Sequence, residues 1–249
     1  MEKAIQNKEF NLYLQPKYDM EKGTIVGAEA LVRWISHENG FISPGDFIPV
    51  FENNGFVYEV DKFIWEESCR CLRKWLDEGL EVHPISVNVS RIDLYDPKLV
   101  DHLVGLREKY HLPADYLQLE ITESAYTEDP EQIIAITNKL REVGFLILMD
   151  DFGTGYSSLN MLKDVHLDVL KLDMGFLKKS CCSLRSRSII SAIIQMAKNL
   201  HMQTIVEGVE TQEHVEFLKS LGCRYAQGYY YSKPLPVDEF EKLIGATGK

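Results

Sequence analysis

The chain has 249 residues, of which 45% are hydrophobic and 26% are charged, a composition that can bury a large core. Its formal net charge is -11 and its basic residues are scattered. This balance argues against a protein that binds duplex nucleic acid, because such binding relies on a basic surface. An acidic protein can still bind a phosphorylated ligand when bound cations supply the positive charge.

The chain carries no mark of secretion, membrane insertion or division into domains. Its five cysteines lack paired zinc-ribbon spacing, so reduced thiols are expected. No apolar run reaches the roughly 18 residues that a bilayer crossing needs. No linker-like segment interrupts the pattern, so we expect residues 1–249 to form a single domain, either complete or excised from a longer multidomain protein. We expect it in the cytoplasm, free or as the cytoplasmic part of a membrane-bound regulator.

The amino-terminal part predicts a hairpin followed by two helices. Residues 10–17 alternate as a strand, and residues 24–34 form a second strand after a short turn, which makes the pair antiparallel. Proline and an acidic residue in the first turn start a helix that covers 43–53. A longer helix covers 60–77 and ends before a glycine.

The rest of the chain alternates between strands and helices. The predicted strands are 84–89, 116–121, 145–149, 169–172, 204–206 and 225–230, and the predicted helices are 97–110, 130–143, 157–163, 187–200, 212–221 and 237–244. This rhythm is typical of parallel strands joined by crossover helices. With the hairpin there are about eight strands, as a TIM-type barrel requires. An open doubly wound sheet is the competing architecture, but it would gather its ligands near one switch point.

Polar side chains close six of the apolar runs. These residues are Glu29, Asn88, Glu120, the pair Asp150-Asp151, Lys171 and Glu207. The carboxyl ends of parallel barrel strands meet at one rim, where the active sites of such barrels lie. The sequence therefore predicts one site assembled from many strand ends.

The adjacent carboxylates Asp150 and Asp151 are the strongest sign of metal binding. They follow a run apolar enough to be buried on both faces, where they repel each other unless a cation lies between them. Capping of the next helix is the alternative, and it explains one carboxylate better than two. The remaining oxygen ligands are Glu29, Asn88, Glu120 and Glu207. An all-oxygen set suits Mg²⁺ or Mn²⁺ rather than zinc.

Lys171 stands out because it interrupts an apolar strand. A buried ammonium is costly unless carboxylates or a bound water pair with it. Two hard cations roughly 3.5–4 Å apart could polarise a phosphoryl oxygen and generate a hydroxide for in-line attack. We expect Lys171 to orient the attacking water or to stabilise the developing charge.

The segment Glu29-Ala30-Leu31-Val32-Arg33-Trp34 begins a series of motifs that continues in order through almost the whole chain. The others are Ser86-Val-Asn88-Val-Ser90, Glu120-Ile-Thr-Glu123, the segment 150–158, Lys171-Leu-Asp173, Glu207-Gly-Val-Glu210-Thr211 and Ala226-Gln227-Gly-Tyr229. The series resembles the EAL family of cyclic di-GMP phosphodiesterases. The resemblance implies a modified TIM (β/α)8 barrel whose first strand is antiparallel, in agreement with the hairpin.

The resemblance also implies roles for single residues. Glu29, Asn88, Glu120 and Asp150 would hold one metal, and Asp150, Asp151 and Glu207 would hold the second. The catalytic residues would be Lys171, Glu207 and Glu123, with Lys171 next to the catalytic water and Glu123 bracing the loop 151–158. Gln15, Leu31, Arg33 and Gln227 would contact the dinucleotide.

We therefore expect an enzyme that hydrolyses cyclic di-GMP to linear 5'-pGpG in bacterial second-messenger signalling. It would use two Mg²⁺ or Mn²⁺ ions per active site and be inhibited by Ca²⁺, whose looser coordination suits in-line attack poorly. A homodimer is expected through the loop after Asp151. The alternative is a catalytically silent cyclic di-GMP receptor that acts through a protein partner. No matched catalytic position is substituted, which favours the enzyme.

Overall fold

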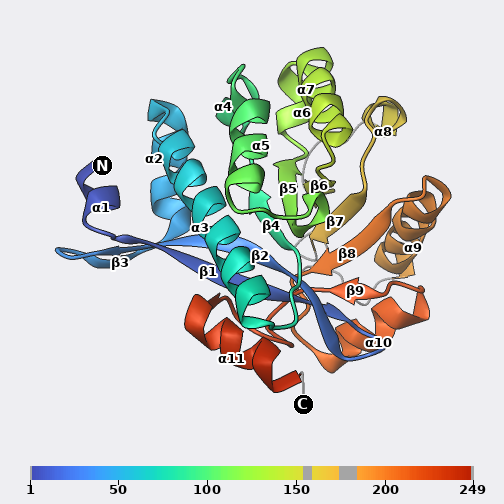
Figure 1. Ribbon diagram of the computed structural model, residues 1–249. Coiled ribbons are helices and arrows are strands. Elements are labelled where there is room, and N and C mark those ends of the chain that lie inside the picture. The colour runs from blue at the N-terminus through green and yellow to red at the C-terminus, as the bar shows by residue number, and fades with distance from the viewer. Residues whose placement is uncertain (1, 154–158, 174–183, 248–249) are drawn as a thin grey trace. The chain divides into compact units, whose positions relative to one another are not determined.

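The computed structural model describes residues 2–153, 159–173 and 184–247 of the chain (Figure 1). They group into two compact units built from interleaved segments. The first unit comprises Met1–Gln15, Gly27–Leu119 and Pro234–Lys249, and the second comprises Pro16–Val26 and Glu120–Lys233. Among the described helices, none has the length and apolarity that a bilayer crossing requires.

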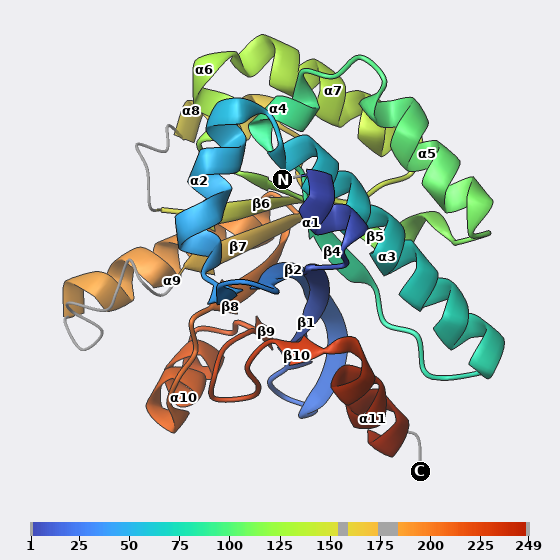
Figure 2. The same ribbon diagram turned by 90° about the vertical axis from the view of Figure 1, so that its left-hand side faces the viewer.

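The first unit contains strand pairs of both directions. Its part of β1 (Phe10–Asp19) pairs antiparallel with β10 (Leu235–Pro236). In β2 (Thr24–Ser36), the residues of this unit pair antiparallel with β3 (Gly40–Ile42) and parallel with β4 (Ile85–Asn88). Its helical segments are α1 (Glu2–Gln6), α2 (Pro44–Asn54), α3 (Val57–Glu78), α4 (Arg91–Leu94), α5 (Leu99–Lys109), the 3₁₀ turn Ala114–Tyr116 and α11 (Val237–Thr247). The long helix α3 packs along α5 and against β4 (Figure 2).

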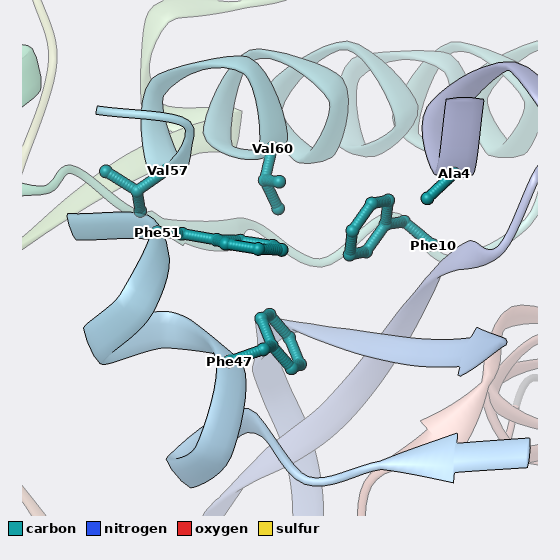
Figure 3. Packing of buried hydrophobic residues seen from close by; sticks show 6 residues of the cluster. All are labelled: Ala4, Phe10, Phe47, Phe51, Val57 and Val60. Carbon is teal, nitrogen blue, oxygen red and sulfur yellow. The ribbon is translucent and has the colours of Figure 1, made fainter. Parts of the chain in front are cut away.

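An aromatic cluster joins β1, α2 and α3 within the first unit (Figure 3). Phe47 and Phe51 lie four residues apart on α2 and therefore share one helix face, with ring centroids 5.2 Å apart. Phe10 of β1 lies with its ring centroid 6.0 Å from each of them. Val57 and Val60 of α3 complete the cluster. Burial of these apolar surfaces fixes α2 against β1 and α3.

The second unit is built around parallel strands. They are β6 (Ile147–Phe152), β7 (Val169–Asp173), β8 (Gln203–Glu207) and β9 (Tyr225–Ala226), each hydrogen-bonded to the next in parallel (Figure 1). The end of β5 (Leu117–Thr122) also belongs to this unit. Its helices are α6 (Ala125–Glu128), α7 (Pro130–Glu142), α8 (Leu159–Asp164), α9 (Leu184–Asn199) and α10 (Gln212–Ser220). Of these, α7 packs on β6 and α9 packs on β8.

The antiparallel orientation of the first strand is confirmed within the second unit. There the end of β1 pairs antiparallel with β9, through Tyr18 opposite Ala226, while β9 pairs parallel with β8. The expected strand over 225–230 is wrong beyond Ala226, because Gly228 has φ +158° and the chain then turns. The short elements α1, β3, α4, α6 and β10 were not predicted. Each has five residues or fewer, too few for a hydrophobic period to become visible.

Asp19 fastens the end of β1. Its side chain is buried, and Oδ1 accepts hydrogen bonds from the backbone N–H groups of Glu21 and Lys22 at 2.9 and 3.1 Å. Oδ2 accepts from Nε of Arg224 at 2.7 Å. Burial acts to raise the pKa of Asp19, but the hydrogen bonds from Lys22, Arg224 and Glu21 outweigh it and hold the pKa below its usual value. The charged carboxylate therefore ties β1 to the segment that leads into β9.

Replacing Asp19 by Asn is expected to lower the free energy of unfolding by about 1–3 kcal/mol at pH 7, since hydrogen bonds to a charged group are lost. A folded-state pKa below the unfolded value of about 3.9 stabilises the fold above that pH. The difference in the free energy of unfolding between wild type and Asp19→Asn should shrink as the pH falls through the folded pKa. Urea unfolding at pH 7 and pH 3 measures this difference, with the exposed Asp115→Asn as control. An equal loss at both pH values would contradict the role of the charge.

Candidate active site

A β-bulge places two carboxylates opposite one lysine. In the pairing of β6 with β7, Met149 lies opposite Leu170 and Phe152 lies opposite Leu172. Two residues, Asp150 and Asp151, therefore face the single residue Lys171, which is the two-against-one arrangement of a bulge. Asp151 has φ +57°, in the left-handed region that non-glycine residues seldom adopt. Because of the extra residue, the side chains of Asp150 and Asp151 do not simply alternate between the two faces, as neighbours in a regular strand do.

The carboxylates of three residues converge at this point. One oxygen atom each from Asp150, Asp151 and Glu207 lies within 4.8 Å of the others. In a regular strand, the neighbours Asp150 and Asp151 would point to opposite faces, so the bulge is what allows both to contribute. Glu207 reaches the same place from the end of the parallel strand β8. The cluster thus consists of hard oxygen ligands, as Mg²⁺ or Mn²⁺ would require.

Lys171 is the cation at the centre of this cluster. Its side chain is fully buried, and its Nζ lies 3.0 Å from Oδ1 of Asp150 and 2.7 Å from Oε1 of Glu207. It also forms a short ion pair with Oε2 of Glu120. The three carboxylates compensate the cost of burying the ammonium, and the ammonium reduces their mutual repulsion. Of the two kinds of partner expected for a buried Lys171, carboxylates or a bound water, the structure shows carboxylates.

Glu120 brings a second buried lysine to the cluster. Nζ of Lys17, on β1, lies 2.9 Å from Oε1 of Glu120, and the side chains are 3% and 0% exposed. No role for Lys17 was predicted from the sequence. The signal that could have indicated one is a lysine among the apolar residues of a strand, as at Lys171.

The electrostatics of Asp151 reflect this crowding. Burial raises the pKa of Asp151, and the neighbouring carboxylate of Asp150 raises it further, whereas Lys171 acts to lower it. A divalent cation bound beside these groups would reverse the balance, because it stabilises the ionised forms. The carboxylates are therefore arranged so that a bound cation relieves a repulsion already present.

Glu123 and Gln227 lie beside the cluster in the second unit. The backbone N–H of Glu123 donates to the carbonyl of Asp150 at 3.0 Å, and its Oε2 accepts from the N–H of Gly153 at 2.9 Å. Glu123 thus holds the chain on both sides of Asp151. The backbone of Gln227 bonds to Val206 and Val209, on either side of Glu207. The dimer prediction refers to the loop after Asp151, of which residues 154–158 lie outside the described residues.

The other expected site residues lie in the first unit. Glu29 on β2 is buried and stands opposite Ser86 of β4, and Asn88 ends β4 two residues later. The backbone carbonyl of Asn88 accepts a hydrogen bond from Nε1 of Trp65 at 2.8 Å. Also in this unit are Gln15, which is buried, and Leu31 and Arg33, which are half-buried.

Comparison with known proteins identifies the family. The family model described as EAL domain matches residues 1–234. The chain belongs to the EAL domain family. Among the curated relatives that it matches is MucR of Pseudomonas aeruginosa, named a bifunctional diguanylate cyclase/cyclic di-GMP phosphodiesterase, at 35% identity over 239 residues. The cyclic di-GMP phosphodiesterase NbdA of the same organism is 37% identical over 246 residues.

The chain spans about a third of the length of these relatives. The aligned region covers 96% of this chain but 35% of MucR, and 99% of this chain but 31% of NbdA. A solved structure of the PaMucR phosphodiesterase in complex with c-di-GMP matches with a TM-score of 0.90 at 35% identity, covering 96% of this chain and 97% of that one. The predicted modified TIM barrel of the EAL family is thereby confirmed. The EAL domain of FimX from Pseudomonas aeruginosa, at 22% identity and a TM-score of 0.85, supports the fold alone.

Gly228 permits a close approach next to the site of this EAL domain. A Cβ atom at Gly228 would lie 2.2 Å from the carbonyl oxygen and 2.3 Å from the nitrogen of Val209. Both atoms belong to backbone, which cannot rotate away as a side chain can. Val209 follows Glu207 by two residues and hydrogen-bonds to Gln227 and Tyr230. Glycine at this position therefore lets the segment after β9 pack against the segment after β8.

Gly228→Ala is expected to lower the free energy of unfolding by about 3 kcal/mol, because overpacking forces the backbone to move. Gly105→Ala is the control. Its Cβ would meet nothing within 4 Å in helix α5, so this change should stabilise by about 0.5–1 kcal/mol. Chemical denaturation of both variants measures the difference. Equal stabilities of the two alanine variants would contradict the close approach.

Proposed function

We propose that this EAL domain is a divalent-metal-dependent phosphodiesterase that hydrolyses cyclic di-GMP to linear 5'-pGpG. The observation that carries the proposal is the convergence of Asp150, Asp151 and Glu207 around the buried Lys171. The names of the relatives support it, since MucR and NbdA are described as cyclic di-GMP phosphodiesterases. A role in bacterial second-messenger signalling follows from the same comparison.

The proposed metal ligands are oxygen atoms throughout. Asp150, Asp151 and Glu207 fit one divalent cation, because an oxygen from each lies within 4.8 Å of the other two. The second ion is assigned to Glu29, Asn88, Glu120 and Asp150. When bound, two Mg²⁺ or Mn²⁺ ions would supply Lewis-acid polarisation of the phosphoryl oxygen and lower the pKa of the attacking water. Two cations would also offset the negative charge that the substrate brings.

The protein's own residues position the water and move its proton. The three N–H donors of the Lys171 ammonium now meet the carboxylates of Glu120, Asp150 and Glu207, and when cations bind these carboxylates one donor can turn to the attacking water. Glu207, whose Oε1 lies 2.7 Å from Nζ of Lys171, is the proposed acceptor of the water proton. Attack of the water oxygen on phosphorus breaks the bond to the 3'-oxygen, so that hydrolysis adds OH to phosphorus and the proton released from the water replaces phosphorus on the 3'-oxygen. Glu123 holds the backbone of Asp150 and Gly153 in place.

Recognition of the dinucleotide is assigned to Gln15, Leu31, Arg33 and Gln227. The planar guanidinium of Arg33 suits a pair of phosphate oxygens. Nη1 of Arg33 donates a hydrogen bond to the carbonyl of Val32 at 2.9 Å, and the guanidinium carbon lies 5.8 Å from the centroid of the Tyr13 ring.

We further propose that residues 1–249 act as one EAL domain in the cytoplasm and that two copies form a homodimer. Three strands, β1, β2 and β5, each run from one compact unit into the other, which supports a single working domain. The dimer contact is proposed for the loop after Asp151, and residues 154–158 of this loop lie outside the described residues.

Incubation of the purified chain with cyclic di-GMP and Mg²⁺ or Mn²⁺, followed by chromatography, tests the activity. We expect pGpG as the product, with no turnover when EDTA removes the cation. Ca²⁺ should not replace Mg²⁺ and should inhibit in competition with it, because its coordination sphere is larger and looser. Tight binding of cyclic di-GMP without product would instead identify a silent receptor. A Ca²⁺-supported rate equal to that with Mg²⁺ would contradict the metal assignment.

Asp150→Asn is expected to reduce turnover at least about 100-fold, because the neutral amide loses a charge from both proposed metal sites. The exposed Asp115→Asn serves as the matched control and should keep wild-type activity. Circular dichroism checks that both variants remain folded. Wild-type turnover in folded Asp150→Asn would show that the residue holds no essential metal.

A further inference from the structure

Lys17 is a buried lysine to which the proposed chemistry assigns no task. Its side chain is 3% exposed, and its Nζ lies 2.9 Å from Oε1 of Glu120, whose side chain is fully buried. Burying an ammonium and a carboxylate together costs several kcal/mol of desolvation, which only good geometry recovers. The pair lies inside the cluster of charged groups rather than at the surface of the unit.

The two oxygens of Glu120 are held by two different lysines. Lys17 contacts Oε1 and Lys171 contacts Oε2. Lys171 is shared, because the same Nζ lies close to Asp150 and Glu207. Lys17 therefore gives Glu120 a contact from another strand and another direction. Two contacts on opposite oxygens fix both the position of the carboxylate and the rotation of its plane.

The strand that carries Lys17 is itself firmly fastened. Directly after Lys17, Tyr18 pairs with Ala226 of β9, and its ring stacks on Tyr231 with centroids 4.6 Å apart. Asp19 is tied to Arg224 by a 2.7 Å hydrogen bond. A lysine on such a strand can act as a rigid support for a neighbouring carboxylate.

We propose that Lys17 is a positioning residue that, through its ion pair, orients Glu120 for binding a divalent cation. This inference rests on the proposed function, in which Glu120 is a metal ligand. Groups that orient metal ligands from behind typically contribute about 10–100-fold to metal affinity. A purely electrostatic effect would have the opposite sign, since an ammonium repels a divalent cation. The direction of the change in affinity therefore separates the two roles.

Lys17→Met removes the ammonium and keeps a long unbranched side chain. We expect the dissociation constant for Mn²⁺, measured by isothermal titration calorimetry on the whole chain, to rise about tenfold or more. Lys17→Arg keeps a cation and should recover part of the affinity. The matched control is Lys22→Met, because Lys22 is an exposed lysine in the turn that follows the same strand. Its dissociation constant should equal that of wild type.

A double-mutant cycle with Glu120→Gln tests whether Lys17 acts through Glu120. In that background Lys17→Met should change Mn²⁺ binding little, because the ion pair is already gone. An unchanged or lower dissociation constant in folded Lys17→Met would overturn the proposal, as would an equally large effect in the Glu120→Gln background. If circular dichroism shows that Lys17→Met is unfolded, the Mn²⁺ affinities of Lys17→Gln and Lys17→Arg are compared instead. Equal affinities of these two variants would then overturn the positioning role of Lys17.

The two proposals fail in distinguishable ways. A wild-type chain that neither binds Mn²⁺ nor hydrolyses cyclic di-GMP contradicts the proposed function. A wild-type chain that does both, together with a folded Lys17→Met of unchanged Mn²⁺ affinity, contradicts only the role of Lys17.

Discussion

The interaction on which the second unit depends is the buried ion-pair network of Lys171. An ammonium in an apolar strand is stable only because three carboxylates surround it, and those carboxylates tolerate one another only because the ammonium lies between them. The three carboxylates come from β5, β6 and β8, so the single ammonium of Lys171 ties these three strands to β7. Removing one member leaves buried charge uncompensated, which typically costs about 3–5 kcal/mol. The same groups that stabilise the sheet therefore define the candidate active site.

Local backbone geometry brings these carboxylates together in an arrangement that could hold a divalent cation. The bulge in β6 and the left-handed conformation of Asp151 let two consecutive carboxylates approach Glu207. Strain of this kind persists only when the surroundings enforce it, and it is concentrated at functional sites. Glu123 supplies part of that enforcement, since it bonds to the backbone before and after Asp151. The repulsion between Asp150 and Asp151 is the feature that a divalent cation would relieve.

The sequence predicted the parts of the fold and site that depend on local patterns. The antiparallel first strand followed from the hairpin, and the polar ends of apolar runs marked Asp150, Lys171 and Glu207 as partners. Other features depend on groups that lie far apart in the chain. Lys17 and Glu120 are separated by 103 residues, and neither residue by itself indicates the other. The bulge in β6 is defined by its register with β7, which the sequence of β6 alone does not contain. Strand β9 ends at Ala226, and Gly228 then approaches the backbone of Val209. Alternation of residue types carries no information on such contacts.

Anomalous scattering of Mn²⁺ in crystals grown with the ion tests most directly whether Asp150, Asp151 and Glu207 bind a divalent cation. We expect a manganese peak coordinated by oxygens of these three residues, with their side chains ordered around it. If the chain hydrolyses cyclic di-GMP with Mn²⁺ but shows no peak at these carboxylates, they are not the metal ligands.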